Sequence, residues 1–149
     1  MSAPVAGSAV QAGERLPPFT LVLTLQRLVM EAAANRDFAA LHHDPEAARA
    51  SGAGSVYMNT TFVETLLEAV VRSWAGLDAW IRVIEFAMKD FNCAGDVVSA
   101  AGVVTSAGPD GGELVAEVDL WVESHRGRTV TGRAVVAFPA DGARPAPGA

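Results

Sequence analysis

The fold of this chain is set by residues 59–76, which read NTTFVETLLEAVVRSWAG. Apolar residues recur there every three or four positions, and this period predicts a helix over about residues 60–75. The predicted apolar face consists of Phe62, Val63, Leu66, Leu67, Val70, Val71 and Trp74. A single neighbouring helix would cover only part of so wide a face, so the helix is expected to lie against a sheet that curves around it.

Both ends of this helix carry recognisable signals. The spacing from Thr61 to Glu64 is that of a capping box, and Asn59 and Thr60 are alternative N-caps just upstream. Gly76 is expected to end the helix, because glycine readily adopts the left-handed backbone that closes helices.

The second half of the chain supplies the predicted sheet. Alternating or β-rich segments predict strands at residues 80–89, 96–106, 114–123 and 129–138, with turns at 109–112 and 124–127. The third of these segments carries apolar side chains on both faces, with Val115 and Trp121 opposite Leu114 and Leu120. This predicts that the outer face of the sheet is also buried, as in an oligomer.

The N-terminal part predicts a strand at residues 19–24 and helices at 25–34 and 46–50. The order is therefore one strand, short helices, a central helix and four antiparallel strands. This is an α+β chain, and the order matches the hot-dog fold, in which a curved antiparallel sheet wraps around a central helix. Such domains usually pair, because one sheet leaves an open edge and the ligand cleft lies between two domains.

Composition limits the classes of protein. Half of the residues are apolar and 19% are charged, which indicates one globular domain, expected at 16–139, with disordered ends at 1–15 and 140–149. The net charge of −6 without a basic cluster argues against a nucleic-acid partner. No apolar run reaches the roughly 18 residues that a membrane span requires. The first residues lack a basic start and an apolar core, so we do not expect them to be a secretion signal. The single Cys93 fits a reducing cytoplasm, where we expect the protein to reside.

The candidate site lies in residues 35–45, NRDFAALHHDP. Asp37 and His42 stand five positions apart in a segment without a clean helical or strand period. A carboxylate and an imidazole held together there could activate one water molecule, because the imidazole titrates near neutral pH and the carboxylate fixes its tautomer. The alternative is that both are solvated side chains in a segment that leads into a helix.

On these residues the chain resembles the MaoC-like enoyl-CoA hydratases and acyl dehydratases over about residues 16–139. The family motif of Asp, four residues and His stands here as Asp37 to His42, followed by a helix that begins Asp44-Pro45-Glu46 and by Gly52. Two departures are visible. Ala39 and Ala40 replace the usual Asn and Pro, and residues 59–61 (Asn-Thr-Thr) replace His-Gly-Met.

These departures look like those of the short subunit of two-subunit steroid-CoA hydratases from bacterial steroid degradation. The resemblance implies reversible addition of water to a 2-enoyl-CoA thioester with Asp37 and His42 as catalytic residues. A backbone N–H at or beside Thr60 would bind the developing oxyanion, with Gly52 also at the substrate site. Asn59 is either the helix cap or a polar wall of the acyl pocket. Coenzyme A is part of the substrate, and no separate cofactor or metal is implied.

The resemblance further implies a partner, a second MaoC-like hot-dog subunit that in this subgroup is often fused to an OB-fold/zinc-ribbon domain. A homodimer is expected otherwise.

Other functions stay open. A hot-dog thioesterase would need a catalytic carboxylate on the central helix, where Glu64 and Glu68 are read as cap and solvated face. A non-catalytic acyl-CoA-binding subunit would keep Asp37 and His42 as a structural pair. An NTF2-like cone is a third fold. His43 is predicted to be a surface or turn residue, and the His-His-Asp run lacks the spaced ligands that zinc needs.

Overall fold

The computed structural model describes residues 10–139. Its elements are β1 (Phe19–Val22), α1 (Leu25–Ala34), the 3-10 helix η1 (Ala40–His42), α2 (Pro45–Ala50), α3 (Thr60–Ala75), β2 (Trp80–Met88), β3 (Val97–Asp110), β4 (Glu113–Ser124) and β5 (Gly127–Phe138). This order confirms the predicted α+β arrangement. The predicted disordered ends at 1–9 and 140–149 lie outside the described residues.

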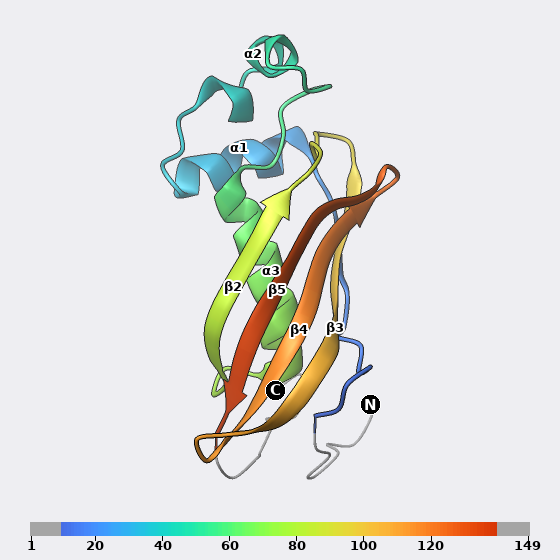
Figure 1. Cartoon of the computed structure of the whole chain (residues 1–149). Coiled ribbons are helices and arrows are strands. Elements are labelled where there is room, and N and C mark those ends of the chain that lie inside the picture. The colour runs from blue at the N-terminus through green and yellow to red at the C-terminus, as the bar shows by residue number, and fades with distance from the viewer. Residues whose placement is uncertain (1–9, 140–149) are drawn as a thin grey trace, which may run out of the picture.

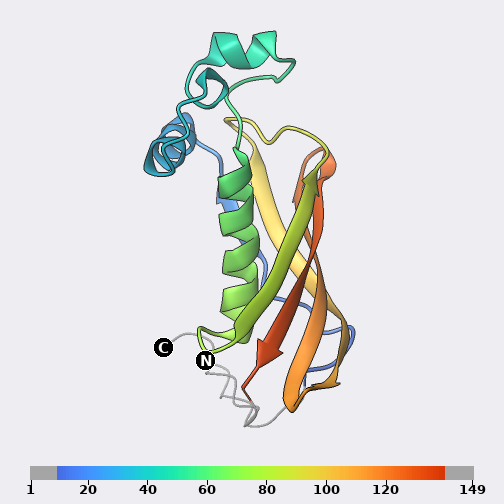
Figure 2. The same cartoon turned by 60° about the vertical axis from the view of Figure 1, so that its left-hand side comes forward.

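The strands form one antiparallel sheet in the order β1-β3-β4-β5-β2. The sheet is twisted and curved, and α3 lies along its concave face (Figures 1 and 2). Helices α1 and α2 gather beyond the N-terminal end of α3. The fold is therefore the predicted hot-dog fold, and the helical segment that carries the candidate motif stands over one end of the central helix.

The core forms between α3 and the inner face of the sheet. The predicted apolar face of α3 is buried without exception, and Ala75 joins it. Buried residues of the strands meet it: Val98, Ala100, Val104, Ala116, Val118, Leu120, Val122, Val130, Ala134, Val136 and Phe138. The ring of Phe138 packs edge-on against Trp74 with 5.3 Å between centroids. Burial of this much apolar surface is the main source of stability for such a domain.

Two local predictions are corrected. The N-cap of α3 is Asn59, whose Oδ1 accepts from Phe62 N at 2.8 Å, so the capping box from Thr61 to Glu64 is wrong. Strand β3 continues through Pro109 to Asp110, and only Gly111-Gly112 forms the turn to β4. Both glycines have positive φ, which suits a two-residue hairpin turn.

Residues 10–15 are predicted to be frayed, but the structure places them along β3. The amide of Gly13 donates to the carbonyl of Val104 at 2.8 Å, and the side chain of Val10 is buried in the core. These residues thus extend the β1 edge of the sheet. Within residues 10–139, no helix has both the length and the apolar character needed to cross a membrane.

A side chain at Gly132 should push β5 away from β2. A Cβ atom built there would lie 2.5 Å from the backbone oxygen of Glu85 and 2.8 Å from Cβ of Phe86. We expect Gly132→Val to lower the free energy of unfolding by about 1–3 kcal/mol, as overpacking does. Urea denaturation measures this. Gly108→Ala is the matched control, because a Cβ at Gly108 would meet nothing within 4 Å. Equal stability of the two variants would contradict the tight packing at Gly132.

Candidate active site

Asp37 and His42 lie close together in the helical segment beyond the N-terminal end of α3. Nε2 of His42 lies 3.5 Å from Oδ2 of Asp37. The His42 side chain is 10% exposed and that of Asp37 is 34% exposed, so the imidazole is enclosed while the carboxylate still faces solvent. The two groups are thus placed to share one water molecule.

The end of α1 positions Asp37. The amide of Arg36 donates to the carbonyl of Ala33 at 3.0 Å, and that of Asp37 donates to Ala32 at 2.9 Å. These two bonds are those of a Schellman motif, whose first residue past the cap adopts a left-handed conformation. Here that residue is Arg36 (φ 58°), where glycine is usual. The motif turns the chain sharply, and Asp37 is the first residue after the turn.

A backbone carbonyl fixes the ring of His42. Nδ1 of His42 lies 2.9 Å from the carbonyl oxygen of Tyr57. Because a carbonyl can only accept, Nδ1 carries a proton, and Nε2 is the ring nitrogen that faces Asp37. Nothing in the sequence pattern singles out this carbonyl, since any residue type could supply it.

The Tyr57 carbonyl is itself held by a short pairing with the loop after β2. The amide of Met58 donates to Asn92 at 2.9 Å, and that of Ala94 donates to Val56 at 2.8 Å. Arg126 clamps this loop, because its Nη2 donates to Asp96 Oδ2 at 2.7 Å. The orientation of His42 therefore depends on contacts that reach to the turn between β4 and β5.

Asn59 also binds Asp37, at the same carboxylate oxygen that faces His42. Its Nδ2 donates to Oδ2 of Asp37 at 3.0 Å, and the amide of Ala39 donates to Oδ1 at 3.3 Å. The hydrogen bond from Asn59 is the main cause that lowers the pKa of Asp37, helped by Ala39 and by the nearby imidazole and opposed by desolvation. The Asp37 side chain is therefore held as a carboxylate.

Glu31 is a third titratable group near the pair, and the sequence pattern did not single it out. Burial raises the pKa of the Glu31 carboxyl, against the opposing effects of its hydrogen bond from Asn35 and of His42. Glu31 also borders an apolar hollow of about 660 Å³ between β1, α1 and α3, whose walls include Phe19, Leu21, Met30, Phe62 and Leu66. Two carboxyl groups of unlike pKa thus lie near the same imidazole.

The remaining predicted site residues are placed differently. Thr60 opens α3 beside Asn59, and its hydroxyl lies 3.8 Å from Sδ of Met88. Its backbone N–H has no hydrogen-bond acceptor among residues 10–139. Gly52 follows α2 with φ 98°, so the backbone turn explains a glycine there, and its contact with substrate stays a prediction.

His43, Glu64 and Glu68, which were not predicted to be catalytic, lie apart from Asp37 and His42. His43 is exposed, and its Nε2 lies 3.3 Å from the carbonyl of Phe38. Glu64 is exposed, and Glu68 forms an ion pair with Arg72 on the outer side of α3. Neither carboxylate of the central helix forms a hydrogen bond or ion pair with Asp37 or His42.

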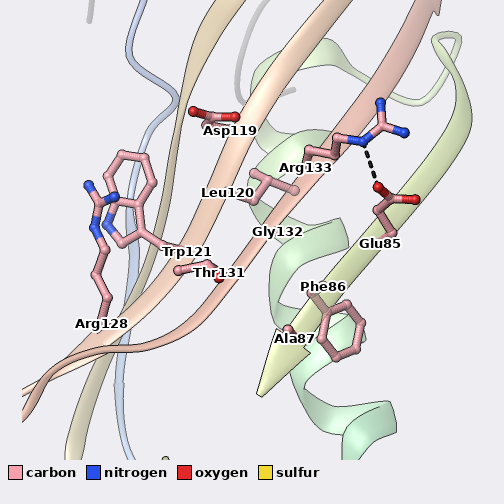
Figure 3. Close-up of a pocket in the computed structure, with 10 residues that line it drawn as sticks. All are labelled: Glu85, Phe86, Ala87, Asp119, Leu120, Trp121, Arg128, Thr131, Gly132 and Arg133. Atoms are coloured by element: carbon pink, nitrogen blue, oxygen red, sulfur yellow. Dashed lines mark hydrogen bonds and ion pairs between the residues drawn. The ribbon is translucent and has the colours of Figure 1, made fainter. Parts of the chain in front are cut away.

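A second hollow, of about 540 Å³, lies on the outer face of the sheet (Figure 3). It is lined by residues of β2, β4 and β5, and none belongs to the candidate site. Arg133 pairs with Glu85 at 2.6 Å, and the guanidinium of Arg128 lies 4.1 Å from the centre of the Trp121 ring. Trp121, predicted to be covered in an oligomer, is already only 8% exposed in the single chain.

Comparison with known proteins agrees with this fold. No protein-family model matches the chain. It is 33% identical over 94 residues to the 3-oxo-4,17-pregnadiene-20-carboxyl-CoA hydratase beta subunit of Mycobacterium tuberculosis, covering 63% of this chain and 73% of that protein. It superposes with a TM-score of 0.79 and 29% identity on a chain of the ChsH1–ChsH2 complex from Mycobacterium tuberculosis, covering 86% of this chain and 98% of the other.

The (R)-hydratase from A. caviae involved in PHA biosynthesis has the same fold, with a TM-score of 0.79 at 21% identity, over 89% of this chain and all of the other. Fold and relatives together define the class as hot-dog hydro-lyases. Within that class, the chain belongs to the MaoC-like hydratase and dehydratase family.

Arg36 should be replaceable by glycine with a gain in stability. A non-glycine residue in the left-handed region costs the folded state about 1–2 kcal/mol. Glycine avoids this cost, but its greater conformational entropy in the unfolded chain offsets part of the gain. We expect Arg36→Gly to raise the free energy of unfolding by about 0.5–1 kcal/mol, measured by urea denaturation. Gly95→Ala is the opposite change at a residue with φ 96°, and it should lower the free energy of unfolding. A destabilised Arg36→Gly variant would show that the arginine side chain contributes more than its backbone costs.

Proposed function

We propose that this chain is an enoyl-CoA hydratase that adds water reversibly to a 2-enoyl-CoA thioester, with Asp37 and His42 as its acid–base pair. The observation that carries the proposal is the 3.5 Å separation between His42 Nε2 and Asp37 Oδ2, with Nδ1 engaged by the Tyr57 carbonyl. When the imidazole is neutral, Nε2 of His42 and Oδ2 of Asp37 are both acceptors. A water molecule lying to one side of this pair can donate one hydrogen bond to each atom, which leaves its lone pairs directed away from them.

In the hydration direction, Nε2 of His42 takes a proton from this water as the water oxygen bonds to the β-carbon of the substrate. The electron pair of the double bond moves onto the thioester oxygen and forms an enolate. The imidazolium then returns the proton to the α-carbon, so one water is added in all. The donor bonds to Asp37 favour its ionised form, and we therefore assign it to orienting the water and stabilising the imidazolium.

The enolate oxygen needs hydrogen-bond donors in a fixed place. The N-terminus of α3 is suited to this, because the first N–H groups of a helix have no partner within it and carry the positive end of its dipole. Asn59 uses the amide of Phe62 through its side chain and that of Val63 through its backbone oxygen. The amides of Thr60 and Thr61 are left over, and we assign the oxyanion to that of Thr60. Loss of one such donor typically costs about 3–4 kcal/mol of the barrier.

The acyl group is proposed by analogy. The relative with 33% identity is named for a steroid-derived acyl-CoA, 3-oxo-4,17-pregnadiene-20-carboxyl-CoA, and we propose that this chain takes a bulky acyl-CoA of the same kind. The reaction requires no cofactor beyond the coenzyme A of the substrate.

We further propose that a second hot-dog subunit pairs with the free edge of β2. This strand is at one end of the sheet order, is nine residues long and exposes Trp80 (70%) and Met88 (37%). A long unpaired edge is a template for another strand. Met88 also contacts Thr60 at the start of α3, so a partner on this edge would stand beside the pair. The ChsH1–ChsH2 neighbour is likewise a complex of two named components.

Replacing either member of the pair should abolish hydration. We expect Asp37→Asn and His42→Ala to lower kcat by about 10²–10⁴-fold, the usual contribution of acid–base catalysis. The loss of ultraviolet absorbance of the conjugated enoyl thioester measures the rate, with a steroid-side-chain substrate and a short linear one. His43→Ala and Asp78→Asn are matched controls and should keep wild-type rates.

Full activity of folded Asp37→Asn and His42→Ala would instead favour a non-catalytic binding subunit. Release of free coenzyme A without hydration would favour a thioesterase.

A positive charge on the β2 edge should weaken the partnership. We expect Ala87→Lys to reduce assembly with a MaoC-like partner, because lysine on an edge strand opposes edge-to-edge pairing. Sedimentation velocity of the chain, alone and mixed with the partner, measures this. Thr105→Lys, on the interior strand β3, is the control and should assemble normally. Equal assembly of both variants would place the interface elsewhere.

A further inference from the structure

The side chain of Asn59 lies between two parts of the molecule that are far apart in sequence. Its Oδ1 accepts from the amide of Phe62 at 2.8 Å, and its Nδ2 donates to Oδ2 of Asp37 at 3.0 Å across 22 positions of sequence. The residue is 5% exposed. Both ends of the amide are therefore engaged within the protein.

We infer that Asn59 is a positioning residue for Asp37: it holds the carboxylate at a fixed place relative to the N-terminus of α3. This inference deepens the proposed function and rests on it for its catalytic consequence. It also replaces the alternative in which Asn59 forms a polar wall of the acyl pocket.

The cap dictates the polarity of the contact. The helix amide can only donate, so the amide oxygen of Asn59 must face Phe62, and the NH₂ group is left to face Asp37. Aspartate can also cap a helix but has no donor, and in serine or threonine the one hydroxyl on a shorter side chain would have to accept from the amide and donate to Asp37 from the same atom. Asparagine is the common capping residue that both closes α3 and donates to a carboxylate.

The second oxygen of Asp37 supports this reading. Oδ1 accepts from the amide of Ala39 at 3.3 Å, so the two carboxylate oxygens are held from two different elements. Ala39 contributes only its backbone there, and Asn59 brings the side-chain amide from the central helix. A carboxylate bound in this way keeps its orientation while a water exchanges beside it.

The consequence is that one side chain links the two halves of the proposed chemistry. The start of α3 offers the oxyanion donor at Thr60, and Asp37 orients the water that attacks the substrate. Asn59 is hydrogen-bonded to both, so its amide contributes to setting the distance from the water to the oxyanion donor. Misplacement by about 1 Å can cost about 10²-fold in rate.

Two variants separate capping from positioning. Asn59→Asp keeps the shape and the cap but replaces the donor by a carboxylate, and Asn59→Gly leaves a residue that N-caps tolerate and that has no side-chain donor. Thr24→Ala is the matched control: it removes the N-cap of α1, where Thr24 Oγ1 accepts from Arg27 at 3.1 Å, without touching Asp37.

The decisive readout is the titration of the Asp37 carboxyl carbon by ¹³C NMR, with the signal assigned by its absence in Asp37→Asn. A donor to the charged form lowers the pKa of Asp37, so its removal should move the titration to higher pH in both Asn59 variants. Thr24→Ala should leave it unchanged. The same titration in Asn59→Asp and in wild type would overturn the inference, because Asn59 would then be a cap only.

Kinetics give the second readout. We expect kcat to fall about 10- to 100-fold in both Asn59 variants with little change in KM, since a positioning residue acts through Asp37 and not on the substrate. An unchanged kcat in a folded Asn59→Asp variant would also overturn the inference. The NMR titration needs no turnover, so it distinguishes failure of this inference from failure of the proposed hydratase function.

Discussion

Burial of one side of α3 is the constraint on which the rest of the structure depends. The helix buries Phe62, Leu66, Val70 and Trp74 on successive turns together with the residues beside them, and this surface is too wide for one flat neighbour. A twisted sheet that curves around the helix satisfies it, because each strand meets the helix with alternate side chains. The other features of the domain are arranged around this packed pair.

The candidate site occupies one end of that helix for a physical reason. A helix N-terminus needs hydrogen-bond acceptors for its first amides and favours negative charge nearby. The side-chain oxygen of Asn59 is the acceptor, and its NH₂ group donates to Asp37. The helical segment between β1 and α3 lies above this end, where it brings His42 onto the same carboxylate. Stability of the helix end and chemistry of the site are thus served by the same contacts.

The surroundings of the site shift the pKa values of its two carboxyl groups in opposite directions. Asp37 receives donors on both oxygens, which lowers its pKa, whereas burial raises that of Glu31. Environments that shift the pKa values of two carboxyl groups in opposite directions are typical of sites where one group must stay charged and another can hold a proton. The carbonyl of Tyr57 completes this arrangement, because it decides which nitrogen of His42 faces the carboxylate.

Much of this could be predicted from the order of residues alone. Hydrophobic period determined α3 and the strands, because periods of 3.6 and 2 residues leave different apolar patterns, and the five-residue spacing of Asp37 and His42 picked out the candidate pair. Only the tertiary structure decided what surrounds that pair: the Asn59 amide, the Tyr57 carbonyl and the Glu31 carboxyl. These groups come from separate elements, and a carbonyl or a helix cap carries no distinctive residue pattern. Their chemistry arises from distances that the folding of the sheet around α3 creates.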